Sequence, residues 1–328
     1  MNGPVSSAAF SLDSKTLVLC GYFTGGAKVY SINNNTITYV SNIYADNGTT
    51  SFNDYVYSIV FSPDSKTLVL GGYFTGHAKI YSIQGTTVTY VSDIYADNSN
   101  TALNGSIKSA SFSPDGKTLV LVGNFTGKAK VYSVNGTTIT YVNDIYADNN
   151  DNALNSTISS VDLSPDGKTL VLGGCFTGRA KIYSVNGTTI TYVSNIYANA
   201  GTTALNNTVY SAAFSPDGGT LILGGGFTGY AKVYFVNGNI ISYVSDVNIG
   251  TTTLSSTVYS VSFSSNSTTF VLSGYFKDCA KIYFISAQTH LAPNGILSEI
   301  PSGARIGYAL TSANQGEYVK VKTIGELN

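Results

Sequence analysis

The stretch "FSPDGKTLVLVGNFTGKAKVY" (residues 112–132) decides the fold, because the chain carries six versions of it. The other copies begin at Phe10, Phe61, Leu163, Phe214 and Phe263. The first five are spaced by 51 residues and the sixth follows after 49. A period of this length is typical of repeat architectures, in which each unit cannot bury its own faces and stacks on its neighbours.

Inside one unit, apolar residues alternate with a period of two, which predicts strands. "VYSIVF" (56–61), "TLVLGG" (67–72) and "AKIYSI" (78–83) are separated by the turn "SPDS" and by a turn containing "FTG". In the third copy "NG" (135–136) predicts a two-residue hairpin that leads into a fourth strand, "TTITYV" (137–142). Four antiparallel strands in one such unit predict a β-propeller blade.

Six copies therefore predict an all-β fold, a six-bladed β-propeller of four-stranded antiparallel blades over residues 1–290. The blades are expected near 5–46, 56–97, 107–148, 158–199, 209–247 and 258–290. The pattern breaks after Phe284, where the NG turn and the Thr-rich strand are missing. Residues 291–328 are then expected to be a short C-terminal β attachment segment, or alternatively part of a seventh blade.

Charge and composition exclude several partners. Lys and Arg number 17 and Asp and Glu 18, so no strong field favours nucleic acid. The sequence contains no run of 18 apolar residues, so membrane insertion is not expected. The N-terminus shows no signal-peptide pattern. Cys20, Cys175 and Cys279 lie at non-equivalent places in their repeats, which favours free thiols over disulfides.

The loops offer a candidate recognition face. Propeller geometry places the connections between blades, such as 95–106, on the same face as the FTG turns. The residue after FTG differs from copy to copy while the scaffold repeats, which is compatible with recognition or with neutral drift. The candidate recognition residues are His77, Lys128, Arg179, Tyr230, Asn98 and Asn149.

Catalytic and metal-binding signals are few. With only two histidines, His77 and His290, no acid–base pair or histidine metal site can be identified, and we expect no enzyme activity and no cofactor. Asp148 and Asp151 provide oxygen ligands for Ca²⁺, but their spacing matches no calcium loop, which favours a solvated turn. A pair of carboxylates for glycan hydrolysis stays open. The Lys of "AK(V/I)Y" occurs in every copy, which predicts a structural role.

"FSPDGKTLVL" resembles the repeats of WD-type propellers, although "VYS" (131–133) replaces the Trp-Asp pair. Over residues 5–285 the chain more closely resembles propeller-repeat proteins of tailed bacteriophages. "RIGYALTSANQGEYVKVKT" (305–323) is similar to a short β module that ends many phage virion proteins.

This resemblance implies a non-enzymatic structural or decorating protein on the head or tail surface of a phage particle, and so a virion location. The loop face would meet a host glycan or protein. The C-terminal segment would bind other virion proteins or sister subunits through Ile306, Tyr308, Tyr318, Val319 and Val321. Two alternatives are a secreted or cell-surface carbohydrate-binding propeller and, third, a glycan hydrolase or lyase.

Overall fold

A computed structural model describes residues 2–34, 36–249, 252–254, 256–275, 280–285, 307–309 and 321–322. These residues form strands and turns, and among them no helix could cross a membrane. The strands of the first three blades are β1 (Val5–Phe10), β2 (Thr16–Gly21), β3 (Ala27–Asn33) and β4 (Thr36–Asn42); β5 (Val56–Phe61), β6 (Thr67–Gly72), β7 (Ala78–Gln84) and β8 (Thr87–Asp93); β9 (Ile107–Phe112), β10 (Thr118–Gly123), β11 (Ala129–Asn135) and β12 (Thr138–Asp144).

The remaining strands continue the pattern. They are β13 (Ile158–Leu163), β14 (Thr169–Gly174), β15 (Ala180–Asn186) and β16 (Thr189–Asn195); β17 (Val209–Phe214), β18 (Thr220–Gly225), β19 (Ala231–Asn237) and β20 (Ile240–Asp246); the small hairpin β21 (Asn248–Ile249) and β22 (Thr252–Thr253); and β23 (Val258–Phe263), β24 (Thr269–Gly274), β25 (Ala280–Phe284), β26 (Gly307–Ala309) and β27 (Val321–Lys322).

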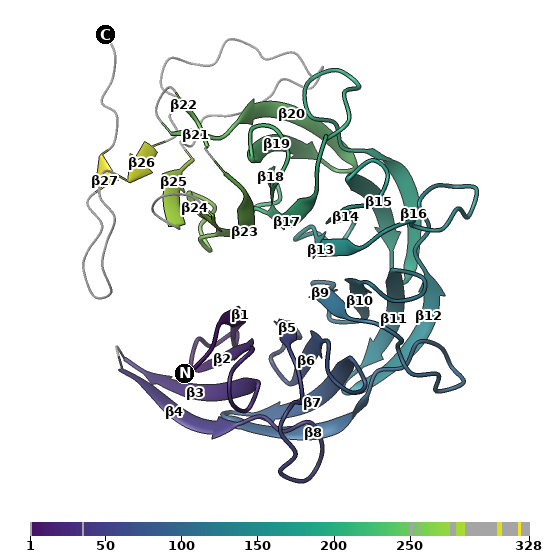
Figure 1. Cartoon of the computed structure of the whole chain (residues 1–328), viewed down its shortest axis with the longest axis vertical. Helices are drawn as coiled ribbons and strands as arrows, with labels where there is room; N and C mark the ends of the chain where they lie inside the picture. Colours follow the sequence, from purple (N-terminus) through teal and green to yellow (C-terminus); the bar gives the residue numbers. More distant parts are fainter. Residues whose placement is uncertain are drawn as a thin grey trace.

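Six antiparallel sheets of four or five strands are arranged around a central axis, which confirms the predicted six-bladed propeller (Figure 1). Each blade runs outward in chain order, so β1, β5, β9, β13, β17 and β23 are innermost. Along this series each innermost strand packs on the next, from β1 on β5 to β17 on β23. The strands that begin each repeat therefore surround the central axis.

Side-chain hydrogen bonds stabilise the SPDG turns. Ser113 donates its hydroxyl hydrogen to Asp115 Oδ1 at 2.6 Å, and the backbone N–H of Lys117 donates to the same oxygen at 3.0 Å. These hydrogen bonds lower the pKa of Asp115, led by the one from Ser113. Gly116 has φ 69°, the left-handed conformation that glycine adopts without strain. The repeated aspartates therefore stabilise the turns.

The outer hairpins turn one residue later than the sequence pattern predicts. Asn135 pairs with Thr138 as the last ladder pair, so Gly136 and Thr137 form the turn and β12 starts at Thr138. Gly136 has φ 60°, whereas Asn135 and Thr137 have no positive φ. Positive φ at the first central residue alone is the type II′ pattern, in which glycine takes that position.

The core lies between blades. One face of blade 2, with Val69, Ala78 and Ile80, packs against Ile107 and Leu121 of blade 3. The same division recurs at the next interfaces, where the Val/Ala/Ile face of one blade meets the Leu/Phe/Tyr face of the following one. No blade buries both of its faces alone, which is the physical reason for the repetition.

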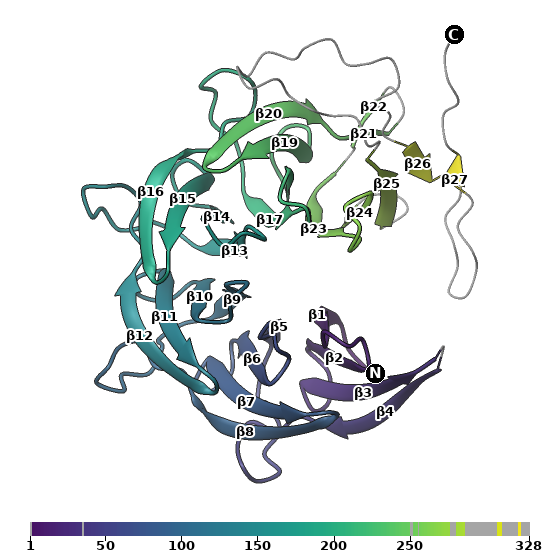
Figure 2. The ribbon, with the colours of Figure 1, turned by 180° about the vertical axis from the view of Figure 1, so that it is seen from behind.

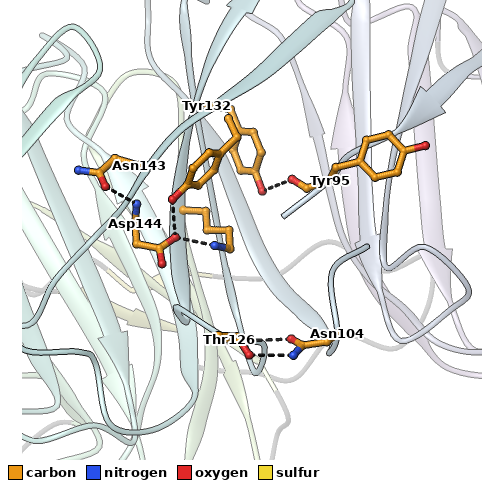
Figure 3. Close-up of polar contacts among 8 residues, drawn as sticks. Tyr95, Asn104, Thr126, Tyr132, Asn143 and Asp144 are labelled. Carbon is orange, nitrogen blue, oxygen red and sulfur yellow. Dashed lines mark hydrogen bonds and ion pairs between the residues drawn. The ribbon is translucent and has the colours of Figure 1, made fainter. Parts of the chain in front are cut away.

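Polar contacts join the same surfaces (Figure 3). The hydroxyl of Tyr132 donates to the Tyr95 carbonyl of the preceding connection at 2.9 Å. Asn104 and Thr126 exchange two hydrogen bonds, at 2.7 and 2.9 Å, that hold the connection against the FTG turn. The repeated lysine pairs with the end of the fourth strand, as Lys130 does with Asp144 at 2.5 Å. This contact agrees with the structural role predicted for that lysine.

Blade 6 obtains its outer strands from the C-terminal part of the chain. β26 pairs with β25, with Tyr308 opposite Tyr283, and β27 pairs with β26. Of the residues predicted for attachment, Tyr308 and Val321 lie in these strands, whereas Ile306, Tyr318 and Val319 lie outside the described residues. Binding to partners through this segment stays a prediction.

The ring has an opening between blades 6 and 1, visible from both sides (Figures 1 and 2). Val5 of β1 is 44% exposed, whereas its counterpart Val56 in blade 2 is fully buried. Phe10 is 57% exposed and its counterpart Phe112 only 8%. The face of blade 1 that would receive a preceding blade is therefore uncovered by the described residues.

Candidate functional site at the loop end of the propeller

Every innermost strand carries a β-bulge at its second residue. In β5, Val56 pairs with Gly72 and Ser58 with Gly71, so Tyr57 has no partner in the ladder. The same shift recurs in the other five innermost strands. A bulge re-aims the side chain of its extra residue. We call these six residues the bulge ring: Ser6, Tyr57, Lys108, Ser159, Tyr210 and Tyr259.

The bulge ring continues into a row of stacked side chains across blades 1 to 3. The rings of Tyr22 and Tyr55 stack at 4.0 Å between centroids and 14° between planes. Tyr55 and Tyr57 stack at 5.5 Å and 9°. Nζ of Lys108 lies 3.6 Å from the centroid of the Tyr57 ring, a cation–π contact. The loop before β5 thus inserts Tyr55 between residues that come from two blades.

A second pair of aromatics belongs to the innermost strands of blades 5 and 6. The rings of Tyr210 and Tyr259 lie 5.1 Å apart and are tilted by 54°. Their strands, β17 and β23, lie on the opposite side of the central axis from β5 (Figure 1). Tyr259 is 54% exposed and Tyr210 37%, so both side chains are accessible from solvent.

The bulge ring lies at the end of the propeller axis that carries the loops. The residue after each second strand bonds back to the segment before the first strand, as the N–H of Tyr73 does to the carbonyl of Tyr55 at 2.8 Å. The FTG turns follow directly, and Asn–Thr pairs hold them to the connections. Connections and FTG turns therefore share one face, as expected from propeller geometry.

Four of the predicted recognition residues border this end, and each adopts a left-handed backbone. His77, Lys128, Arg179 and Tyr230 have φ between 56° and 59°, which is uncommon outside glycine. Nζ of Lys128 donates to Asn124 Oδ1 at 3.0 Å, and Nη1 of Arg179 donates to the Cys175 carbonyl at 2.6 Å. All four are half-buried, so the predicted set forms a second, outer row around the bulge ring.

The other predicted site residues lie apart from the bulge ring. Asn98 and Asn149 are exposed in the connections between blades. Asp148 accepts hydrogen bonds from the N–H of Asn150 at 2.9 Å and from Nδ2 of Asn152 at 2.8 Å, and these bonds lower its pKa. Its carboxylate is thus used within the turn. Neither Asp148 nor Asp151 belongs to a group of three potential metal ligands within the described part of the chain.

The sequence pattern missed the bulge ring for a physical reason. In a regular strand the second residue lies on the same face as the fourth, and in β5 that fourth residue, Ile59, is buried between blades. The second position would then belong to the core. The available signal was its variation between repeats, from Ser6 to Tyr57 to Lys108, which is as large as the variation after FTG.

Comparisons with known proteins support the fold. No family model and no curated protein matches the chain. A protein from Lactobacillus plantarum is similar with a TM-score of 0.68 and 13% identity, over 86% of this chain and 81% of that one. A periplasmic gluconolactonase of Pseudomonas aeruginosa gives 0.63 and 15%, over 86% and 82%. A functionally unknown protein from Desulfotomaculum acetoxidans gives 0.64 and 14%, over 94% and 90%.

These neighbours correct the expected function. The expectation of a structural protein of a phage particle is wrong, because the neighbour with a named function is a periplasmic gluconolactonase and none of the three is described as a virion or WD-repeat protein. The expected absence of enzyme activity also gains no support from the fold, since one propeller of this shape is an enzyme. At these identities the comparisons establish the fold alone.

Proposed function

We propose that the chain is a carbohydrate-binding β-propeller that holds a sugar at the bulge ring, at the loop end of the propeller axis. The observation that carries this proposal is the stacked row of Tyr22, Tyr55 and Tyr57 with Lys108 at its end. Tyr55 and Lys108 differ from their counterparts in all other blades, whereas Tyr22 and Tyr57 each recur as tyrosine in two of them. Side chains that depart from the repeat at one accessible place are suited to recognition.

Tyrosine chemistry matches a sugar. A sugar ring presents apolar C–H groups on its faces and hydroxyl groups at its rim, and tyrosine combines an apolar ring with a polar hydroxyl. The stacked rings fix one another, so little side-chain entropy is lost when a ligand binds. Ser6 and Ser159 add hydroxyl groups to the same ring of residues. The bulge ring and its neighbours thus combine fixed aromatic rings with several hydroxyl groups, the arrangement that a polyhydroxylated ligand requires.

Glycan-array screening followed by calorimetry tests the proposal. The full chain should bind a defined set of glycans, and Tyr57→Ala should weaken binding about tenfold or more through loss of the stacked ring. The matched control is Tyr95→Ala, which removes a tyrosine side chain that is 37% exposed and lies outside the bulge ring. Absence of glycan binding, or equal effects of the two variants, would overturn the proposal.

A lactonase activity is the second candidate, and the single observation in its favour is the shared fold with a gluconolactonase. It is tested by following acid release from glucono-δ-lactone at constant pH. If hydrolysis of the lactone depends on bulge-ring residues, the function of this site is catalysis and not binding alone. Background hydrolysis alone would leave the binding proposal as it stands.

A further inference from the structure

Lys108 is the charged member of the bulge ring, whose other members are serines and tyrosines. The bulge in β9 removes Lys108 from the ladder between Ile107 and Ser109. Its Nζ is then held over the Tyr57 ring at 3.6 Å, and the side chain is half-buried. The position of this ammonium group is thus fixed by a backbone irregularity and an aromatic ring.

Lys108 differs from the repeated lysines in its electrostatic surroundings. Lys79 and Lys130 each bond an aspartate at 2.5 Å, whereas the Tyr57 ring is the contact that the described residues provide for Lys108. Burial lowers the pKa of Lys108, and among the described residues no acidic group raises it again. The pKa of the Tyr57 hydroxyl is raised, first by burial and second by the negative charge of nearby Asp54. A half-buried cation to which the described part of the chain supplies no counter-ion is unfavourable, so this position is suited to an anion.

We infer that the sugar held at the bulge ring is an acidic one, and that Lys108 binds its carboxylate. This inference rests on the proposed carbohydrate binding. A single ammonium group surrounded by tyrosines and serines matches one monovalent carboxylate on a polyhydroxylated ring. A phosphate group would carry up to two charges and is usually bound by several cations or backbone N–H groups. A neutral sugar would offer hydrogen-bond acceptors to Lys108 but no counter-charge.

The test uses an array of glycans that end in uronic or sialic acids, printed beside the same glycans with each carboxyl group reduced to an alcohol. The wild-type chain should bind the acidic members about tenfold or more tightly, the range of a charge-assisted hydrogen bond. Lys108→Gln should bind both members of each pair equally. The control Lys117→Gln, an exposed lysine in the SPDG turn, should bind as the wild type does.

The outcomes separate the two proposals. If the wild-type chain binds acidic and reduced glycans equally, and Lys108→Gln changes neither, the carboxylate inference is wrong and carbohydrate binding stands. If neither class binds, both proposals are wrong. If Lys108→Gln weakens both classes equally, Lys108 supports the tyrosine row through Tyr57 and selects no charge. Added salt should weaken the acidic glycans alone, because screening acts on the ion pair.

Discussion

Asp162 shows how one residue can depart from the repeat inside the scaffold. It lies on the innermost strand β13, and its Oδ2 accepts a hydrogen bond from the N–H of Phe214 on β17 at 2.8 Å. The equivalent residues are uncharged: Ala9, Val60, Ser111, Ala213 and Ser262. Burial raises the pKa of Asp162 to about 7, against the lowering effect of backbone hydrogen bonds from Phe214 and Leu163.

This shift predicts a dependence of stability on pH. Since the folded pKa lies above the unfolded value of 3.8, the folded state holds the proton more tightly. The contribution of protonated Asp162 to the free energy of unfolding is therefore fully present below about pH 4 and is lost as pH rises through about 7. Asp162→Asn keeps an oxygen acceptor for Phe214 and removes the charge, so it should be more stable than the wild type at about pH 8. Urea unfolding at about pH 5 and 8 measures this.

Asp115→Asn serves as the control, because hydrogen bonds lower the pKa of Asp115. Its carboxylate stabilises the folded state above the unfolded pKa, so this variant should be less stable than the wild type at about pH 8. An Asp162→Asn variant that loses stability at the higher pH would show that the charged form is the favoured one in the folded protein.

Gly26 and Phe52 predict a compensated pair of substitutions. A Cβ atom on Gly26 would lie 2.8 Å from Cβ of Phe52. The other blades place a side chain at the position of Gly26 and a leucine at that of Phe52, such as Lys128 with Leu154. Gly26→Lys should thus destabilise by about 1–3 kcal/mol, the range for overpacking. Adding Phe52→Leu should recover most of the loss in thermal unfolding, and equal losses in both variants would refute this pairing.

At the scale of elements, Tyr132 and Tyr283 form a matched pair on third strands. Tyr132 of β11 donates to the Tyr95 carbonyl at 2.9 Å, whereas the buried hydroxyl of Tyr283 on β25 finds no acceptor in the described part of the chain. Tyr132→Phe should destabilise by about 1 kcal/mol, and Tyr283→Phe should be neutral or stabilising. Chemical denaturation of both variants measures the difference. A clear loss in Tyr283→Phe would mean that its hydroxyl is bonded in solution.

Local patterns predicted the elements well and their registers less well. Alternation and SPDG turns are properties of neighbouring residues, so strands such as β6 and β10 could be placed from sequence. The bulge at Tyr57 depends on how β5 aligns with β6, a relation between strands that alternation does not contain. Likewise, the hairpin after Asn135 turns at Gly136, because the ladder extends to the Asn135–Thr138 pair. The candidate site was missed because it depends on register.

At the scale of the whole molecule, the number of repeats gave the number of blades and left ring closure undetermined. Closure depends on the angle between successive blades, which arises from packing along all their interfaces. Val5, Phe10 and Tyr30 of blade 1 repeat the residues that elsewhere meet a preceding blade. Tyr30 is half-buried, whereas its counterpart Tyr81 is 1% exposed. Blade 1 therefore carries the residues of an interface that no blade among the described residues completes.

The opening predicts unequal effects of one substitution in two blades. Phe10 is 57% exposed and Phe112 is 8% exposed, although they occupy the same position of their repeats. Phe112→Ala should destabilise by about 3 kcal/mol or more, since it removes a buried ring and leaves a cavity. Phe10→Ala should cost less than about 1 kcal/mol, because most of its ring is already in water. Urea unfolding of both variants, with protein concentration varied, provides the comparison. If Phe10→Ala costs as much as Phe112→Ala, blade 1 is covered in solution, and a cost that grows with protein concentration would identify a second copy as the cover.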